Sequence, residues 1–437
     1  MNTELNILSR FQYTSKEWLY AKILTIILWL YPVINIVFKF NSQPMPVGIC
    51  KLFNCAFLTL SPFSYIISLV AIILTGLYLL ERQMLIVTFM MSLLGVVVFS
   101  IEASNGLHGR KEGVSMLFIV QFLAYLRYYL AGRDFKNSTT QHNIAMFYSV
   151  QIVAVIFVLA AVAKLEVSGI RWVIDSPTIA VRLLRALCMR TMDTGYAVFE
   201  QYGRFMSQRI IDNPNIVRVG FGFVLLAELF SFCAIFSRKW AWRYGILLVL
   251  INIGFVVLLG IVISFYFLPI LAFLINLGRG ARNVSEEKYS LSKNFSLHSF
   301  AVMFTIPLVY AGITFIVGEQ HPFSKVPLFT SSSNRTAYYY LKDQNDSLLQ
   351  GNERAIYRTG EIKDIIHEKS KTKDVLLDDP DGIKTLAPEV LKQLLAAKGN
   401  NDKLKGVSEL KLYMHEIKLV NNKIEERDIL LGSKPVR

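Results

Sequence analysis

The sequence predicts an all-α polytopic membrane bundle of about eight or nine transmembrane helices, followed by a small C-terminal α+β soluble domain. Of the 437 residues, 53% are apolar and the mean hydropathy is +0.43, values too high for an ordinary soluble domain. Residues 19–317 hold nearly all the long apolar runs, whereas 318–437 is dense in Lys, Asp, Glu and Asn. We therefore expect an N-terminal segment at 1–18, a transmembrane domain at 19–317 and a soluble domain at 318–437.

The net charge of +14 lies almost entirely in the apolar part, because acidic and basic residues nearly balance in 318–437. Loop lysines and arginines of membrane proteins mark the cytoplasmic side. The positive charge is therefore a topology signal, and nucleic acid is not an expected partner. The first apolar run is followed by no small-residue cleavage pattern, so we expect no removable signal peptide. The lack of a eukaryotic sorting pattern favours a bacterial inner membrane.

Nine apolar segments are candidate crossings, since roughly 20 residues of helix span about 30 Å of hydrocarbon. They lie at 19–38, 63–80, 84–102, 114–131, 145–165, 217–237, 244–261, 262–278 and 298–317. The stretch 244–278 is ambiguous. A break near Gly260 or Pro269 makes it two shorter passes, whereas a single tilted helix with an interfacial extension gives one.

The orientation follows from the basic residues of the short loops. With the N-terminus inside, the inner loops hold most of them, including Arg82, Arg133, Arg238 and Arg243. This bias places the N-terminus in the cytoplasm. Nine crossings then place 318–437 in the periplasm, whereas eight would place it in the cytoplasm.

The segment 166–216 differs from an ordinary loop. In 178–206, Arg182, Arg185 and Arg190 alternate with leucines at helical spacing. This amphipathic pattern favours interfacial helices that cap the bundle, with a solvated connector as the alternative.

The C-terminal region contains its own secondary-structure signals. A strand is expected at 336–342, a turn at 344–347, and a helix at 387–398 with Pro388 in its first turn and Gly399 after its end. Residues 410–414 alternate like a strand, and Asn421-Asn422 can turn the chain back into 424–431. The Lys- and Asp-rich segment 369–381 is expected to be a flexible join.

Ionisable groups within crossings are costly to leave unpaired and are therefore the first candidates for function. Lys164 stands near the end of the fifth crossing, where it either snorkels to the headgroups or lies partly desolvated as a base. Arg127 and Glu228 lie within other crossings and are expected to pair as structural ions. Glu102 and His108 lie towards the same outer face as Lys164. His108 is either a solvated loop residue or a catalytic one.

Motifs for other chemistries are absent from the sequence. The remaining histidines show no HxxxH or HExxH spacing, so no metal is expected. No Walker loop, GxGxxG at a strand-to-helix junction or GxSxG is present, which argues against nucleotide hydrolysis and serine-type hydrolysis.

Three segments carry a resemblance to a known family. They are 157–166 (FVLAAVAKLE) with Trp172 following, 222–229 (GFVLLAEL) with Arg238 and Lys239 beyond, and 252–255 (NIGF) with Phe265. In order and spacing they resemble the vitamin K-dependent γ-carboxylase family and its bacterial relatives, the horizontally transferred transmembrane (HTTM) domain proteins. The resemblance covers roughly residues 15–330.

The resemblance implies that Lys164 is the base that deprotonates a reduced quinone, with His108 as a helper. Two positions depart from the family pattern: Asn252 stands where relatives carry histidine, and Ala161 stands where they carry glycine. The large lumenal region that binds substrate in the carboxylase is also absent. These departures favour a membrane factor for maturation or export of a secreted or envelope protein. Residues 331–437 of the membrane factor would recruit that protein. The alternative is a quinol- or lipid-linked enzyme using Lys164; a transporter ranks third because no repeated halves are found.

Overall fold

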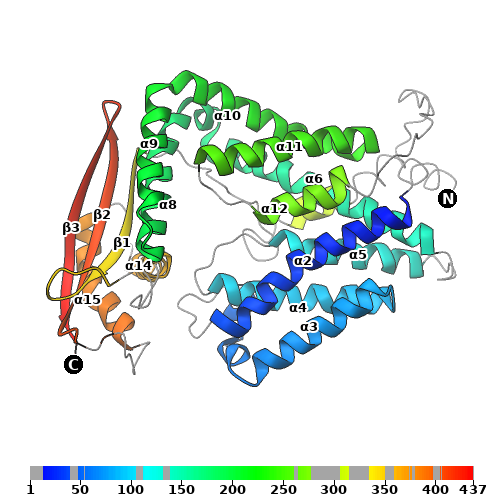
Figure 1. Ribbon diagram of the computed structural model, residues 1–437, viewed down its shortest axis with the longest axis horizontal. Helices are drawn as coiled ribbons and strands as arrows, with labels where there is room; N and C mark the ends of the chain where they lie inside the picture. Colours follow the sequence, from blue (N-terminus) through cyan, green and yellow to red (C-terminus); the bar gives the residue numbers. More distant parts are fainter. Residues whose placement is uncertain are drawn as a thin grey trace.

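The computed structural model describes residues 13–39, 48–53, 55–104, 112–130, 138–259, 264–276, 306–313, 334–349, 359–373, 375, 379–396, 404 and 406–436. Within these ranges the chain is mostly helical, with one three-stranded sheet near the C-terminus (Figure 1). Four described helices are long and apolar enough to cross a membrane: Met84–Ile101, Gln141–Ser168, Pro214–Ile235 and Arg238–Val256. The expected class, a helical protein with membrane-crossing helices and a small C-terminal α+β unit, is confirmed.

The bundle helices agree closely with the apolar runs of the sequence. They are α2 (Ser15–Lys39), α3 (Phe63–Leu79), α4 (Met84–Ser104), α5 (Glu112–Leu130), α6 (Ser138–Ser168), α10 (Pro214–Leu229), α11 (Arg238–Leu259) and α12 (Ser264–Pro269). The turn η4 (Phe230–Ile235) follows α10, the π-helical turn η5 (Ile270–Ile275) follows α12, and two 3-10 turns, η1 (Gly48–Lys51) and η2 (Cys55–Thr59), lie between α2 and α3. Residues 306–313 are also helical and fall within the expected last crossing, most of which lies outside the described residues.

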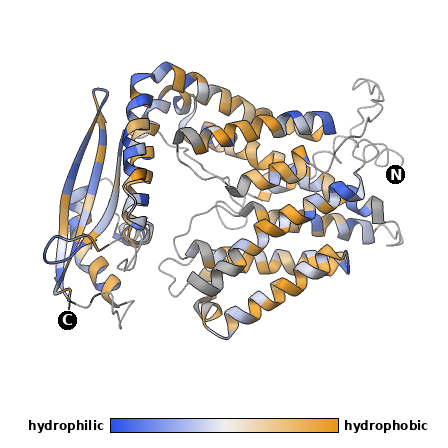
Figure 2. Cartoon of the chain, in the orientation of Figure 1, coloured by the Kyte–Doolittle hydropathy of each residue, from blue (hydrophilic) through white to orange (hydrophobic). Residues whose placement is uncertain are grey.

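Helix α6 is the central element of the bundle. Its apolar span is almost entirely buried inside the protein, whereas the spans of α10 and α11 are mostly exposed. A helix that is apolar all round belongs in such an interior, and exposed apolar faces on the other helices suit contact with lipid. Figure 2 shows the hydrophobic colouring that runs along the bundle helices.

Helix α2 begins earlier than its apolar run because of a capping box. The Glu17 backbone N–H donates to the Thr14 hydroxyl at 3.3 Å, and the Thr14 backbone N–H donates to Glu17 Oε2 at 2.7 Å. This reciprocal pair satisfies N–H groups that the first helical turn leaves without partners. Residues 15–18, assigned to the N-terminal segment from the sequence, are therefore helical.

The ambiguous stretch 244–278 forms two antiparallel segments. α11 ends at Leu259 and α12 begins at Ser264, next to the break expected at Gly260. Gly245, near the start of α11, lies against Leu274 and Ile275 at the end of η5. The described second segment consists of α12 and η5, six residues each, which rise about 18 Å and are shorter than a bilayer core.

The connection from α6 to α10 is a helical hairpin. It follows the short helix α7 (Arg171–Ile174) and the turn η3 (Ser176–Thr178), and it consists of α8 (Ile179–Thr194) and α9 (Val198–Asp212). Gly195, with φ of 77°, ends α8 in the left-handed conformation that glycine tolerates best. In Figure 1 both helices run across the end of the bundle, between it and the sheet.

The C-terminal sheet lies between two helical layers. Strands β1 (Arg335–Lys342), β2 (Glu409–Val420) and β3 (Lys423–Pro435) pair antiparallel in the order β1-β2-β3. Tyr339 and Leu341 face helices α14 (Thr359–Lys373) and α15 (Pro380–Ala396), while Tyr338 and Tyr340 face α8. Burial on both faces explains why β1 reads as a continuous apolar run.

The hairpin expected at Asn421-Asn422 is confirmed, since both residues have positive φ and connect β2 to β3. Two other expectations in this region are wrong. Helix α15 begins at Pro380, so Pro388 lies inside it and not in its first turn. Residues 369–373 complete α14, so the join expected over 369–381 is shorter than predicted.

Close packing of α11 on η5 predicts different effects for two glycines of the same helix. A Cβ at Gly245 would lie 2.8 Å from Ile275 Cγ1 and 2.9 Å from Leu274 Cβ, whereas none of the described atoms lies within 4 Å of a Cβ at Gly254. We expect Gly245→Ala to lower the free energy of unfolding by about 1–3 kcal/mol. Gly254→Ala should raise it by up to about 1 kcal/mol. Thermal unfolding in detergent measures both, and equal effects would contradict the antiparallel packing.

Candidate functional site

The Lys164 side chain is buried between helices. It lies near the end of α6 with 2% of its surface exposed. Its Nζ donates to Glu228 Oε2 on α10, and Glu228 is 6% exposed. The Trp172 ring of α7 covers the ammonium, with Nζ 4.8 Å from the ring centroid. An ion pair under an aromatic face is one of the few ways to keep a charge in such an interior.

Apolar residues enclose this pair. Ala161, Trp172, Val224 and Leu225 form a buried cluster against which Phe221 and Phe255 pack. The Ser231 hydroxyl of η4, the turn that follows α10, donates to the Ala154 carbonyl oxygen of α6 at 2.9 Å and so adds a second contact between this segment and α6. Water is excluded from the two charged groups, so the interaction between them is stronger than on a surface.

The pairing expected for Arg127 and Glu228 is wrong. Glu228 holds Lys164, and Arg127 donates through Nη1 to the Tyr148 hydroxyl. Sequence position alone did not show that α6, and not α5, lies beside the acidic turn of α10. The structure thus joins two candidates, Lys164 and Glu228, that the sequence analysis had kept apart.

Of the other candidate residues, Asn252, Glu102 and His108, the structure describes the side chain of Asn252 alone. Asn252 is buried on α11, where its Nδ2 donates to the Leu248 carbonyl oxygen at 2.7 Å in its own helix. Glu102 lies in the last turn of α4, and its side chain is outside the described part. His108 lies outside the described residues. Within those residues, no group of three or more His, Cys, Asp or Glu side chains is arranged to hold a metal ion.

A second buried charge cluster lies at the opposite end of the bundle. Lys22, 2% exposed, donates to Glu81 Oε1 at 2.6 Å and to the Leu79 carbonyl oxygen at 3.0 Å. His142 lies 3.0 Å from the other oxygen of Glu81 and stacks on Trp18. Partial burial raises the pKa of Glu81, but the contacts with Lys22 and His142 lower it more, so the pKa of Glu81 lies below its usual value. The sequence did not reveal this cluster, although Lys22 lies inside the first apolar run.

The same end carries an ion pair between Glu17 of α2 and Arg238 of α11. The Asn276 side chain donates to the Glu17 carbonyl oxygen at 3.3 Å. The starts of α2 and α11 and the end of η5 therefore meet at one end of the bundle. The α8–α9 hairpin and the sheet lie at the other end, where α6 finishes.

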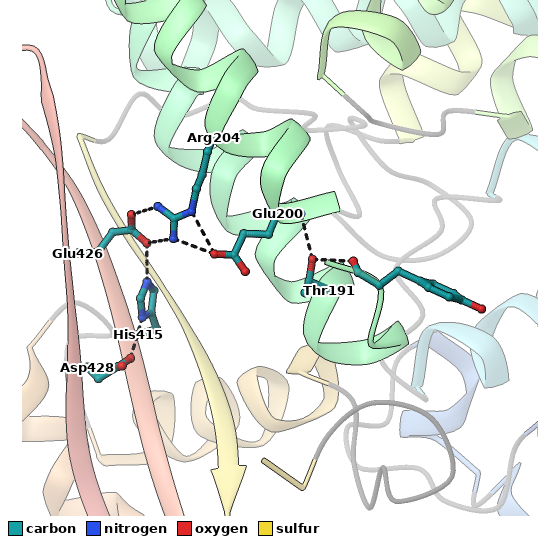
Figure 3. A network of polar contacts seen from close by, with 7 residues as sticks. Thr191, Glu200, Arg204, His415, Glu426 and Asp428 are labelled. Atoms are coloured by element: carbon teal, nitrogen blue, oxygen red, sulfur yellow. Dashed lines mark hydrogen bonds and ion pairs between the residues drawn. The ribbon is translucent and has the colours of Figure 1, made fainter. Parts of the chain in front are cut away.

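A polar network joins this hairpin to the sheet (Figure 3). Arg204 of α9 contacts Glu426 of β3 and Glu200 of its own helix. His415 of β2 lies between Glu426, 3.0 Å from Nε2, and Asp428, 2.7 Å from Nδ1. Both ring nitrogens face carboxylate oxygens, an arrangement that suits the imidazolium with two N–H donors.

The electrostatics of this network agree with its geometry. Burial opposes a charged imidazole, but Glu426 and Asp428 together raise the pKa of His415 above its usual 6.5. The hydrogen bond from His415, with Arg204 beside it, lowers the pKa of Glu426 to about 2. Below the network, Tyr338, Tyr340 and Ile417 pack on Val181, Leu184 and Cys188 of α8 in one apolar cluster.

Comparisons with known proteins identify no similar protein. No protein-family model matches the chain, and neither a curated protein nor a solved structure is similar to it. The class that the fold and the site define is a helical protein with membrane-crossing helices, a buried Lys–Glu pair and a C-terminal sheet joined to the bundle by a helical hairpin.

Removal of one partner of the buried pair should destabilise the protein more than removal of both. Lys164→Met leaves Glu228 as an unpaired buried carboxylate, and we expect a loss of about 3–5 kcal/mol in the free energy of unfolding. The double variant Lys164→Met, Glu228→Met should recover most of this loss, because two apolar side chains replace the pair. Thermal unfolding of both variants in detergent provides the measurement. A double variant as unstable as the single one would contradict the pairing.

The His415 network predicts that the attachment of the sheet to α9 depends on pH. The pKa of His415 is raised, so its contribution is complete below about pH 6.5 and is lost as the pH rises through the raised value. The lowered pKa values of Glu426 and Asp428 keep their contribution until the pH falls below their usual values of 4.5 and 3.8. His415→Gln should therefore lower the free energy of unfolding by roughly 1 kcal/mol near pH 6 and by less near pH 9. Urea unfolding at both pH values tests this, and an equal loss at both would be inconsistent with an imidazolium.

Proposed function

We propose that this chain is a multi-pass membrane protein of HTTM-like architecture that serves the maturation or export of a secreted or envelope protein. It has nine crossings, with the N-terminus in the cytoplasm and the C-terminal domain in the periplasm of a bacterial inner membrane. The C-terminal domain recruits the partner, and the bundle holds that domain at the membrane surface.

The placement of the two ends of the chain supports this topology. Glu17, Lys22 and Arg238 lie at the end of the bundle where α2 begins, and the sheet lies beyond the end where α6 finishes (Figure 1). The first end also carries the basic and aromatic residues Lys239, Trp240 and Arg243, which suit the cytoplasmic interface. An odd number of crossings separates the start of α2 from the C-terminal sheet in this way.

One observation carries the recruiting role: the C-terminal sheet is fixed to α8 through one face yet ends in a long edge strand. β3 has 13 residues, and among the described strands it pairs with β2 alone. An edge strand presents unpaired backbone N–H and C=O groups that an extended segment of another protein can complete. The charged side chains Lys423, Glu425 and Arg427 along it discourage pairing with a second copy of the same strand.

The recruiting role is tested by site-specific photo-crosslinking in cells. A photoreactive side chain in place of Glu425, which is exposed on β3, should form adducts with a protein that bears a secretion signal. The same side chain in place of Lys392, exposed on α15 of the same domain, is the matched control and should form none. Identical adducts from both positions, or none from Glu425, would count against recruitment by this edge.

The arrangement around Lys164 favours one alternative, a quinol-linked enzyme. Lys164 and Glu228 form a buried ion pair, and the Trp172 and Phe221 rings, which pack against each other with centroids 5.1 Å apart, make its surroundings apolar. In this alternative Lys164 is the base that takes a proton from a reduced quinone, as the resemblance implies. His108, the helper that the resemblance implies, lies outside the described residues.

The double variant of Lys164 and Glu228 separates this alternative from a structural role. It keeps the fold but removes both proton-accepting groups. Loss of quinol turnover by this variant in liposomes, with folding retained, would support the enzyme. Rates equal to those of the unmodified protein would leave the pair with a structural role.

A further inference from the structure

Two arginines of α8 face the joint between the hairpin and the C-terminal domain. Arg182 and Arg185 are three residues apart and therefore lie on one side of the helix. Both are half-buried, while Arg190 on the same helix is exposed and stacks on Phe199. The amphipathic pattern of the sequence did not distinguish these two arginines from the exposed one.

Arg185 has many more hydrogen-bond donors than partners. Its Nη1 donates to the Thr336 hydroxyl of β1 at 3.1 Å, and its Nε is buried without a hydrogen-bond partner among the described residues. A guanidinium has five N–H donors, and a buried polar group without a partner is costly. Arg185 thus contributes several donors to a place where water is partly excluded.

No described carboxylate offsets the charge of Arg185. The groups that act on it are the neighbouring Arg182, whose positive charge opposes its own, and Tyr339 of β1. Burial, followed by the charge of Arg182, lowers the pKa of Arg185 below its usual value. By contrast, Arg204 on the adjacent helix has two glutamates in contact. The described carboxylates therefore neutralise Arg204, and none of them neutralises Arg185.

We infer that Arg185, supported by Arg182 and Thr336, binds a phosphate group at the joint between α8 and β1. A guanidinium presents parallel N–H groups that match two oxygens of a phosphate, and a threonine hydroxyl can donate to a third. A bound dianion would offset the repulsion between the two arginines and fill the unused donors of Arg185. The inference does not depend on the recruiting role of β3.

Two sources supply this chemistry: the phosphate of an anionic lipid headgroup and a free phosphate ester. The α8–α9 hairpin runs across the end of the bundle (Figure 1). Lipid headgroups are expected where membrane-crossing helices end. A site there can take its phosphate from a lipid while the sheet stays outside the bilayer. The bound group would then tie the C-terminal domain to the membrane surface.

The experiment compares the full-length protein in nanodiscs and in detergent. The first arm measures thermal stability and lipid retention by native mass spectrometry in phosphatidylcholine nanodiscs with and without phosphatidic acid. The second arm adds inorganic phosphate to the detergent-solubilised protein, with chloride at equal ionic strength as the reference. Stabilisation in the first arm alone identifies a lipid headgroup, and stabilisation in the second identifies a free phosphate. No stabilisation in either arm overturns the inference.

Three variants localise the site. Arg185→Gln should weaken phosphate or lipid binding about tenfold, the effect of losing one hydrogen bond to a charged group. Arg185→Lys keeps the charge but loses the paired donors and should show a smaller loss. Arg190→Gln, which removes the same charge from an exposed position of the same helix, should bind like the unmodified protein. An equal loss for Arg185→Gln and Arg190→Gln would indicate diffuse charge attraction and would overturn the site. If Arg185→Gln does not fold, the nanodisc and detergent measurements on the unmodified protein test the inference.

Discussion

The arrangement of the bundle depends on ion pairs that join helices distant in sequence. Lys164 of α6 meets Glu228 of α10, Lys22 of α2 meets Glu81 after α3, and Glu17 of α2 meets Arg238 of α11. In a lipid environment apolar packing discriminates weakly between neighbouring helices, because lipid tails are as apolar as leucine. A charge that must be neutralised discriminates strongly. These pairs therefore specify which helices are neighbours.

The pairs also make the two ends of the bundle different. At one end Lys22, Glu81 and His142 connect α2, the α3–α4 turn and α6, and Glu17 connects α2 to α11. Towards the other end Lys164 binds Glu228 beneath Trp172, and the chain then enters the α8–α9 hairpin. α6 takes part in the pairs at both ends, which agrees with its central, almost fully buried position.

The parts of this structure that the sequence predicted are those encoded locally. Apolar runs gave α3, α4 and α5 to within two residues, and Asn421-Asn422 gave the β2–β3 turn. Lys164 was singled out because a lysine in a crossing is rare, but its partner lies 64 residues away and depends on which helices pack together. For the same reason Arg127 was paired incorrectly. The amphipathic pattern of α8 suits lipid, water or protein as a neighbour, so the sequence did not show that the sheet covers it.

The joint between the bundle and the C-terminal domain combines two kinds of interaction with different roles. Burial of a large side chain such as Tyr338, Tyr340 or Ile417 contributes roughly 1.5–3 kcal/mol, whereas a partly exposed ion pair such as Arg204–Glu426 contributes about 0–1 kcal/mol. The apolar cluster therefore provides most of the attachment, and the charged network fixes its orientation. Tyr338 and Tyr340 on β1 would become exposed if the sheet left α8, so the burial of these two rings opposes separation of the domain from the hairpin.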